Sequence, residues 1–319
     1  MISFELSVED LADTRFAISS LNETIFSLRV LRDPGLSALH LPWRRSVLAR
    51  LDPADVALLV GVVGEKLALP DFLTPRPAVF APSFEEELAI VRRADPRVVR
   101  HDLEAALVAG PLPADDASAV RLRDAVCEAL VRYWTLALAP TWPRMRLLLE
   151  ADMTYRARQL AVGGARLLFA DMHPNLRWQD GVLRIDKMIG RHHVVVSGRG
   201  LLLLPSVFAH KPAPPVSPDE PPSLVYPSRG VATLWEAGPS PDPAALTALL
   251  GAPRARLLRL LEEPLATVEL ARRLRVTPSA VSQHLRVLYA TGLVTRTRDG
   301  RQVLYRRTPL ADRLAAPPR

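Results

Sequence analysis

Four polar side chains near the C-terminus have the spacing that would place them on one face of a helix. They are Ser279, Ser282, Gln283 and Arg286. At about 100° per residue all four fall within one sector, while the apolar Val281, Leu285 and Leu288 fall on the opposite side. Hydroxyl, amide and guanidinium groups can pair with base edges and phosphates in a DNA major groove. The pattern predicts a helix that packs with one face and contacts DNA with the other.

Start and stop signals around this helix predict the elements that position it. Thr277-Pro278 combines a capping hydroxyl with a proline at the first helical position, and Gly292 supplies a stop. A shorter helix precedes it, with Thr267 placed to cap its start and Glu269 in its first turn. The two helices, separated by a tight turn, predict a helix-turn-helix.

A basic hairpin is predicted after the second helix. Residues 293–298 and 301–307 flank Asp299-Gly300, and an Asp-Gly pair between two such segments favours a hairpin. The arginines that it carries are Arg296, Arg298, Arg301, Arg306 and Arg307. Helix, turn, helix and hairpin together predict a winged helix-turn-helix.

This stretch resembles the winged helix of the arsenical-repressor (ArsR) family of bacterial transcription regulators. The resemblance rests on V-S-Q-H-L-x-x-L from Val281, G-L-V from Gly292, R-x-G-R from Arg298 and V-L-Y from Val303. It covers only the C-terminal part of the chain. It implies that residues 278–290 form the recognition helix and that the following hairpin is the wing. The residues then expected to contact DNA are Thr277, Ser279, Ala280, Ser282, Gln283, Arg286, Arg296, Arg298 and Arg301.

The charge distribution favours DNA over a protein as the partner of this module. A winged helix used only for protein contacts would have the same apolar interior, so the interior cannot decide. From Asp242 to the C-terminus there are fourteen Arg against six Asp or Glu, an excess of eight positive charges. The preceding 241 residues hold 27 basic and 28 acidic side chains. A basic footprint confined to one module suits phosphate binding, and we expect double-stranded DNA as the partner.

Length and composition predict more than one globular domain. The chain has 319 residues, of which 49% are hydrophobic. We expect an N-terminal domain over residues 1–235, a proline-rich linker over 236–243 and the winged helix over 244–316. The expected fold class is α+β: a mostly helical N-terminal domain with a small antiparallel sheet, followed by the winged helix-turn-helix.

Local signals also predict elements of the N-terminal domain. The capping-box pattern Ser20-Leu-Asn-Glu23 predicts a helix that runs to about Arg32. Residues 144–171 predict a helix loosened at Gly163-Gly164. Asp180-Gly181 predicts one hairpin, and Gly198-Arg-Gly200 predicts another.

The N-terminal domain resembles a domain of unknown function that high-GC bacteria place ahead of an ArsR-type winged helix. The resemblance rests on W-R-R-S from Trp43, A-D-M-H-P-N from Ala170 and Y-P-S-R-G-V from Tyr226. That domain has no assigned activity to transfer. The options left open are binding of an unknown small-molecule ligand, binding of a partner, and formation of a homodimer.

Metal and cofactor sites are not expected. Thiolate sensors of the ArsR family carry a cysteine pair on or near the helix before the recognition helix, where this chain reads V-E-L-A-R-R-L from Val268. Zinc sensors of the family use Asp and His of the last helix, where this chain has Asp312 and no histidine. The single cysteine, Cys127, lies in an apolar helical pattern typical of a buried thiol. His192 and His193 would point to opposite faces of a strand.

Catalytic motifs are missing from the sequence: it has no G-x-S-x-G elbow, no H-E-x-x-H, no phosphate loop and no Rossmann fingerprint. Asp171 with His173 could form an acid–base pair, but we favour His173 as a cap of the preceding helix's C-terminus. We therefore expect no catalytic residues; an enzyme in the N-terminal domain carrying a DNA-binding tail is the alternative.

The N-terminus lacks a signal-peptide pattern, and no apolar run approaches the ~20 residues of a membrane span. We expect no membrane contact and a cytoplasmic location. Together the patterns predict a dimeric regulator of transcription, a repressor, that binds an inverted-repeat operator.

Overall fold

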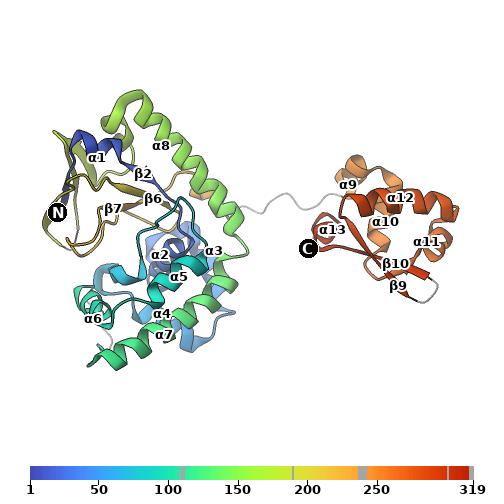
Figure 1. Ribbon diagram of the computed structural model, residues 1–319, viewed down its shortest axis with the longest axis horizontal. Helices are drawn as coiled ribbons and strands as arrows, with labels where there is room; N and C mark the ends of the chain where they lie inside the picture. Colours follow the sequence, from blue (N-terminus) through green and yellow to red (C-terminus); the bar gives the residue numbers. More distant parts are fainter. Residues whose placement is uncertain (107, 109–111, 189, 236–242, 300–301, 316–319) are drawn as a thin grey trace. The chain divides into compact units, whose positions relative to one another are not determined.

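The computed structural model describes residues 1–106, 108, 112–188, 190–235, 243–299 and 302–315 (Figure 1). The chain folds as two compact units, Met1–Glu236 and Ala237–Arg319. Residues 236–242 of the predicted linker lie outside the described residues. Helices dominate and small sheets accompany them, so the predicted α+β fold class is confirmed.

The first unit contains helices that vary from one turn to twenty-nine residues. They are α1 (Val8–Ala12), α2 (Ser20–Arg32), α3 (Leu41–Leu48), α4 (Pro53–Gly61), α5 (Phe84–Arg92), α6 (Pro96–Ala105), α7 (Asp116–Tyr133) and α8 (Trp142–Ala170). Short turns are η1 (Pro34–Leu36), η2 (Ala38–His40), η3 (Glu65–Leu67), η4 (Asp71–Leu73), the π turn η5 (Trp134–Leu138) and η6 (Val231–Thr233). All of α2 except Arg32 is buried, and α2 contacts α4 and α5. It is therefore the central helix of this unit.

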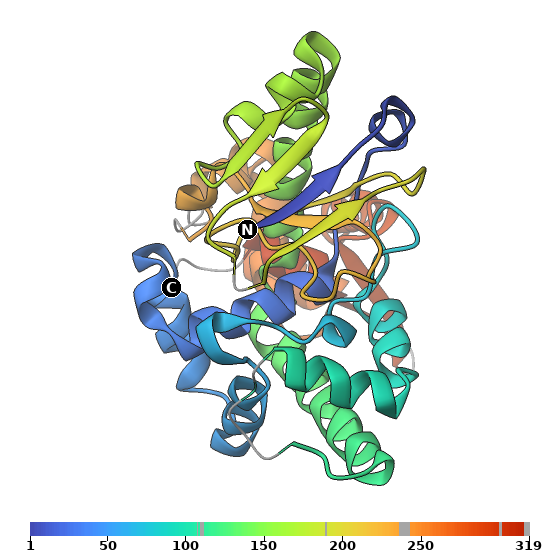
Figure 2. The same cartoon turned by 90° about the vertical axis from the view of Figure 1, so that its left-hand side faces the viewer.

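Two sheets of different topology complete the first unit. The larger has the strand order β3-β4-β1-β5 and the smaller the order β2-β6-β7. The strands are β1 (Ile2–Glu5), β2 (Arg15–Phe16), β3 (Leu176–Gln179), β4 (Val182–Ile185), β5 (His192–Val195), β6 (Leu202–Ser206) and β7 (Ser223–Pro227). In Figure 1 the labelled strands and α8 lie toward one end of the unit, and α4, α6 and α7 lie toward the other. The colours show the same separation in Figure 2.

The prediction of one small antiparallel sheet is wrong in its topology. In the larger sheet β1 pairs antiparallel with β4 but parallel with β5, and in the smaller sheet both pairings are parallel. The hairpin predicted across Gly198-Arg-Gly200 is also wrong, because β5 and β6 belong to different sheets. The Asp10 carboxylate accepts the Gly198 N–H (2.7 Å) and holds this connection against α1. The hairpin across Asp180-Gly181 is confirmed.

The strand β6 separates the two apolar cores of this unit. Leu202 and Leu204 pack in the core formed with the helices, whereas Leu201 and Leu203 pack in the core formed with the larger sheet. Successive side chains of a strand point to opposite faces, so one run of leucines can supply both cores. A strand buried on both faces is typical of a parallel sheet.

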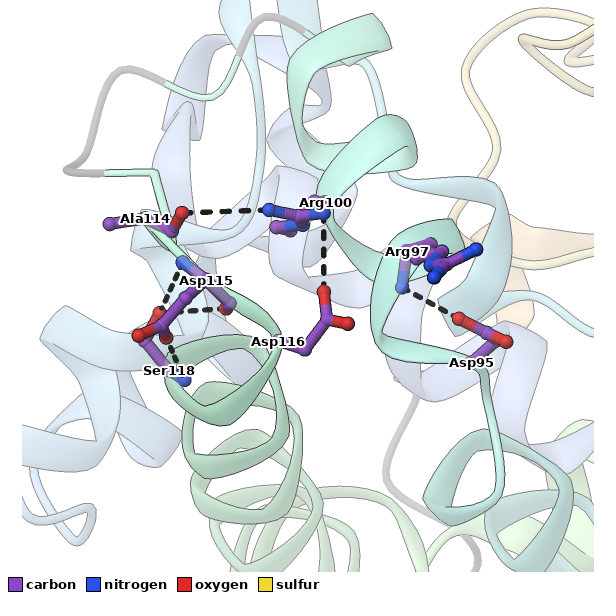
Figure 3. Close-up of polar contacts among 7 residues, drawn as sticks. All are labelled: Asp95, Arg97, Arg100, Ala114, Asp115, Asp116 and Ser118. Atoms are coloured by element: carbon purple, nitrogen blue, oxygen red, sulfur yellow. Dashed lines mark hydrogen bonds and ion pairs between the residues drawn. The ribbon is translucent and has the colours of Figure 1, made fainter.

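Aspartate side chains cap the starts of α6 and α7 (Figure 3). The Asp95 carboxylate accepts the Arg97 N–H (2.8 Å) at the start of α6. Asp115 and Ser118 form a reciprocal capping box at the start of α7. Arg100 joins the two helices through an ion pair with Asp116 (3.1 Å). Helix α6 ends at Ala105.

The capping box predicted at Ser20–Glu23 is absent among the described atoms, and a simple cap lies one residue earlier. The hydroxyl of Ser19, not Ser20, caps α2 by accepting the Asn22 N–H (2.8 Å). Glu23 is then free to point inward, where its Oε2 accepts the Val207 N–H (2.9 Å). The helix itself ends at Arg32 as predicted, and α8 has non-helical dihedral angles at Gly163 and Gly164 as predicted.

Glu23 should make the stability of this unit depend on pH. Burial raises the pKa of Glu23 from 4.5 to about 8, although the hydrogen bonds around Ser206 and Val207 act in the opposite direction. Between these two pKa values the folded state keeps a proton that the unfolded state has lost. The free energy of unfolding therefore falls as the pH rises through this window.

Glu23→Gln should remove this contribution. Between pH ~6.5 and pH ~8 the free energy of unfolding of the wild type should fall by about 1–2 kcal/mol more than that of the variant. Urea unfolding at both pH values measures it. Glu86→Gln is the matched control, because hydrogen bonds from Ser83 lower the pKa of Glu86, away from this window. A Glu23→Gln difference that does not change with pH contradicts the prediction.

The second unit has the elements of a winged helix with a short C-terminal helix. They are α9 (Pro243–Leu250), α10 (Ala252–Leu260), β8 (Leu265–Ala266), α11 (Thr267–Leu274), α12 (Pro278–Ala290), β9 (Val294–Asp299), β10 (Gln302–Arg307) and α13 (Pro309–Ala315). The sheet has the order β8-β10-β9 and is antiparallel. A separate apolar core, which includes Leu258, Leu270 and Leu285, joins α10, α11 and α12.

Candidate nucleic-acid interface

The helix α12 presents its polar face to solvent because its apolar face is buried. Val281, Leu285 and Leu288 are at most 1% exposed. The side chains on the opposite face, all exposed, are Ser279, Ser282, Gln283 and Arg286. The face predicted from the sequence is therefore open to a large partner. His284 lies between the two faces and is half-buried.

The start of α12 is built by the predicted cap. The Thr277 hydroxyl accepts the Ala280 N–H (3.3 Å), and Pro278 occupies the first turn. Thr277 is exposed and Ala280 is half-buried, so of these two predicted contact residues only Thr277 is fully open to a partner. The preceding α11 is followed by its C-cap residue Arg275, whose φ of 55° lies in the left-handed region and turns the chain toward α12.

The side chains of α11 show which of its arginines already have partners. Glu269 forms ion pairs with Arg272 (2.8 Å) and Arg273 (2.7 Å). These bonds lower the pKa of Glu269 to about 2.

The predicted cap at Thr267 is wrong, since Ala266 occupies the N-cap position and Thr267 is the first helical residue. Ala266 is the last residue of β8, which pairs with β10, so the strand passes directly into α11.

The hairpin β9–β10 carries basic side chains beside α12. Arg296 and Arg298 are two residues apart on β9, hence on one face of the strand, and both are exposed. The Arg296 guanidinium lies 4.5 Å from the centre of the Tyr289 ring, which couples the wing to the end of α12. Arg306 is also exposed.

The wing differs from its prediction at the turn and at Arg307. Asp299 pairs with Gln302, so Asp299 belongs to β9 and not to the predicted turn. Arg301, a predicted DNA contact, lies outside the described residues. The Arg307 side chain is only 11% exposed and forms an ion pair with Asp312 (2.9 Å), so it stabilises the unit instead of facing a partner.

The two residues suggested as an acid–base pair are bound to other groups. The Asp171 carboxylate accepts hydrogen bonds from the Tyr155 hydroxyl (2.8 Å) and the Arg156 guanidinium. His173 Nδ1 accepts the Asn175 N–H (3.0 Å). It therefore stabilises the turn into β3 and does not cap α8, which corrects the predicted role.

The remaining candidates for metal binding are dispersed. Cys127 is fully buried in α7, and burial raises the pKa of its thiol to about 11. His193 in β5 contacts Ser3 (2.9 Å) and Glu5 (3.0 Å). Within the part of the chain that the structure describes, no cluster of three or more His, Cys, Asp or Glu side chains could hold a metal ion. None of the helices in the described ranges has both the length and the apolar character of a membrane span.

Comparison with known proteins assigns the C-terminal unit. Residues 254–297 match a family described as a helix-turn-helix domain, a range that begins in α10 and ends in β9. A solved structure described as "Crystal structure of Possible transcriptional regulator for arsenical resistance" is 37% identical, with 24% of this chain and 78% of that chain covered and a TM-score of 0.19. No curated protein matches the chain. The C-terminal unit therefore carries a helix-turn-helix domain, a class of module that binds DNA through its second helix.

Proposed function

We propose that the chain is an ArsR-like transcription regulator that binds double-stranded DNA through α12 and the wing. The observation that carries this proposal is the face of α12, on which Ser279, Ser282, Gln283 and Arg286 are exposed opposite a buried apolar stripe. Amide and guanidinium groups at such positions can form paired hydrogen bonds with purine edges. Arg296 and Arg298 on the adjacent strand would bind the phosphates that flank the groove.

The fuller proposal is a repressor that binds an inverted-repeat operator as a homodimer. Four contacting side chains read only a few base pairs, which is too little for the ~10⁻⁸ M or tighter affinity of specific regulators. Two copies of α12 related by a two-fold axis double the contact. In this scheme residues 1–235 form a sensor and dimerisation domain, residues 236–243 a linker and residues 244–316 the DNA-binding domain.

Selection of bound sequences from random double-stranded DNA tests this function. The full-length protein should enrich an inverted repeat whose half-sites lie about 10 base pairs apart or a multiple of that spacing. The enriched operator, placed over a promoter, should reduce transcription when the protein is added. Binding that shows no sequence preference after repeated selection would refute a sequence-specific regulator.

Arg298→Ala is expected to weaken binding to all DNA sequences alike. A phosphate contact carries no sequence information, so affinity for the operator and for an unrelated duplex should fall by the same factor. The slope of log affinity against log salt should shrink by about one, because one fewer counterion is released. Fluorescence anisotropy over a range of salt concentrations measures both quantities. Arg97→Ala removes the same charge from the other unit and should change neither; a loss confined to the operator would contradict the assignment.

Arsenite, cadmium and zinc should leave the protein–DNA complex intact at one equivalent. Arsenite and cadmium bind preferentially to thiolates, and burial raises the pKa of the Cys127 thiol to about 11. Zinc also accepts imidazole and carboxylate ligands, but the described residues hold no cluster of three or more His, Cys, Asp or Glu side chains. Cys127→Ala should respond to these metals as the wild type does. Anisotropy of labelled operator during a metal titration measures release, and release by one equivalent of any of the three would overturn the prediction.

A further inference from the structure

A cavity in the N-terminal unit lies between one face of α2, the segment 66–77 and the loop 211–221. Its volume is about 110 Å³. An apolar cavity of ~150 Å³ in another protein encloses benzene. The present cavity is smaller but partly open to solvent, so a ligand of about one aromatic ring can extend beyond it. The apolar side chains of its wall include Phe26, Leu67, Leu69, Leu204 and Val225.

The α2 wall of the cavity combines an apolar ring with two polar groups. Asn22, Phe26 and Arg29 are four and three residues apart, which places them on one face of the helix. Asn22 is 8% exposed, and its Oδ1 has no hydrogen-bond partner among the described atoms. The amide can be turned to present either its oxygen or its nitrogen to a ligand.

Arg29 is a buried cation that is only partly satisfied. It is 7% exposed, its Nε donates to the Leu67 carbonyl (2.8 Å), and its guanidinium carbon lies 4.3 Å from the centre of the Phe26 ring. Its Nη1 is buried and, among the described atoms, has no hydrogen-bond partner. A buried charged donor without a partner is costly, and a ligand acceptor would remove that cost.

Further cations reinforce the positive character of the cavity. Lys66, Arg76 and Lys211 also line it. The pKa of Lys211 is lowered, chiefly by burial and secondly by repulsion from the positive charge of Arg29. An anion between them would be attracted by both.

Of the two acidic side chains in the wall, Asp71 is engaged by the backbone of the loop. The two carboxylate oxygens of Asp71 accept the Val216 N–H (2.9 Å) and the Ser217 N–H (2.7 Å), and so tie the loop 211–221 to η4. Glu220 is the other acid in the wall. Arg29, Lys66, Arg76 and Lys211 outnumber these two, so the wall carries an excess of positive charge.

We propose that this cavity binds a small organic carboxylate of about the size of benzoate. Arg29 and Lys211 bind the carboxylate, Asn22 donates to it, and Phe26 and the leucines of the wall contact the apolar body. Guanidinium groups favour carboxylates because two parallel hydrogen bonds can form. The apolar wall favours an organic acid over inorganic phosphate. The inference concerns the N-terminal unit alone and does not rest on DNA binding.

Calorimetric titration of the full-length protein with sodium benzoate tests the proposal. We expect one site per chain, with benzamide, the neutral analogue, binding at least about tenfold more weakly, because charge-assisted hydrogen bonds are lost. Arg29→Met and Lys211→Met should each weaken benzoate at least about tenfold while changing benzamide little. Arg97→Met is the matched control: this arginine is exposed on α6, and benzoate affinity should be unchanged.

Several outcomes would overturn the proposal. They are equal affinity for benzoate and benzamide, unchanged benzoate affinity in Lys211→Met, and phosphate binding as tightly as benzoate. Failure of both benzoate and hexanoate to bind at millimolar concentration also overturns it. Arg29 is buried, so its variant is first checked by circular dichroism; Lys211 is only half-buried, and its variant decides the question if Arg29→Met does not fold.

Discussion

Replacing Gln283 or Arg286 with Ala should reduce affinity for the selected operator by about 1–3 kcal/mol, or roughly 5- to 150-fold. Both side chains are exposed on α12, opposite the buried Val281, Leu285 and Leu288. Removing either should therefore leave the packing intact and eliminate only contacts to base edges. The preference for one base at one position of each half-site should be lost with it.

Competition between the operator and its single-base variants measures this effect for each protein. Arg286→Ala should flatten the ranking of variants at one position and leave the ranking at other positions unchanged. The comparison with Arg298→Ala is decisive, since the wing variant should lower affinity without altering any ranking. Wild-type affinity and ranking in both Gln283→Ala and Arg286→Ala would show that a different face of the helix meets the bases.

Most elements of the C-terminal unit were predictable because the signals that form them are local. The hydroxyl of Thr277, the proline after it and the apolar stripe of α12 all act within thirteen residues. The errors in this unit also concern residues that are close together in the sequence. Asp299, predicted to lie in the turn of the wing, joins the ladder opposite Gln302 instead. Arg307 looked like a surface residue until the fold brought Asp312 beside it.

The N-terminal unit was less predictable because its sheets join distant segments. The β3–β4 hairpin is closed by Asp180-Gly181 and was visible in the sequence. The parallel pairing of Arg15 with Leu202 and of Leu202 with Ser223 has no such local signal. Two adjacent serines, Ser19 and Ser20, could each cap α2, and the burial of Glu23 decided between them.

The ligand cavity could not be found from the sequence for the same reason. Arg29 reads as an ordinary basic residue in the last turn of a helix, where cations are common. Only the fold places Lys211, from a loop more than 180 residues later, against the same space. The proline-rich loop 211–221 forms one wall of this cavity.

The C-terminal helix bears on how the DNA-binding units pair. The resemblance to the ArsR family implies pairing through the first and last helices of the winged helix, but α13 here has only seven residues, about 10 Å of helix. Ala311 is already buried inside the unit. The large apolar side chains exposed on the described parts of α9 and α13 are Leu249, Leu310 and Leu314, which are 71%, 44% and 37% exposed. Three partly exposed leucines supply a modest contact.

The fragment that begins at Asp242 should therefore form dimers more weakly than the full-length protein. Its own apolar core, built around Leu258, Leu270 and Leu285, should keep it folded, which circular dichroism can confirm. Without a stable dimer, the second half-site no longer binds at high effective concentration, and affinity for the inverted repeat should fall by about 10²-fold or more. Affinity for a single half-site should stay the same, since α12 is unchanged. Sedimentation velocity and anisotropy on both proteins measure the two effects. A monomeric full-length protein that binds one half-site tightly, or a fragment that dimerises as well as the whole chain, would exclude a contribution of the N-terminal unit to dimerisation.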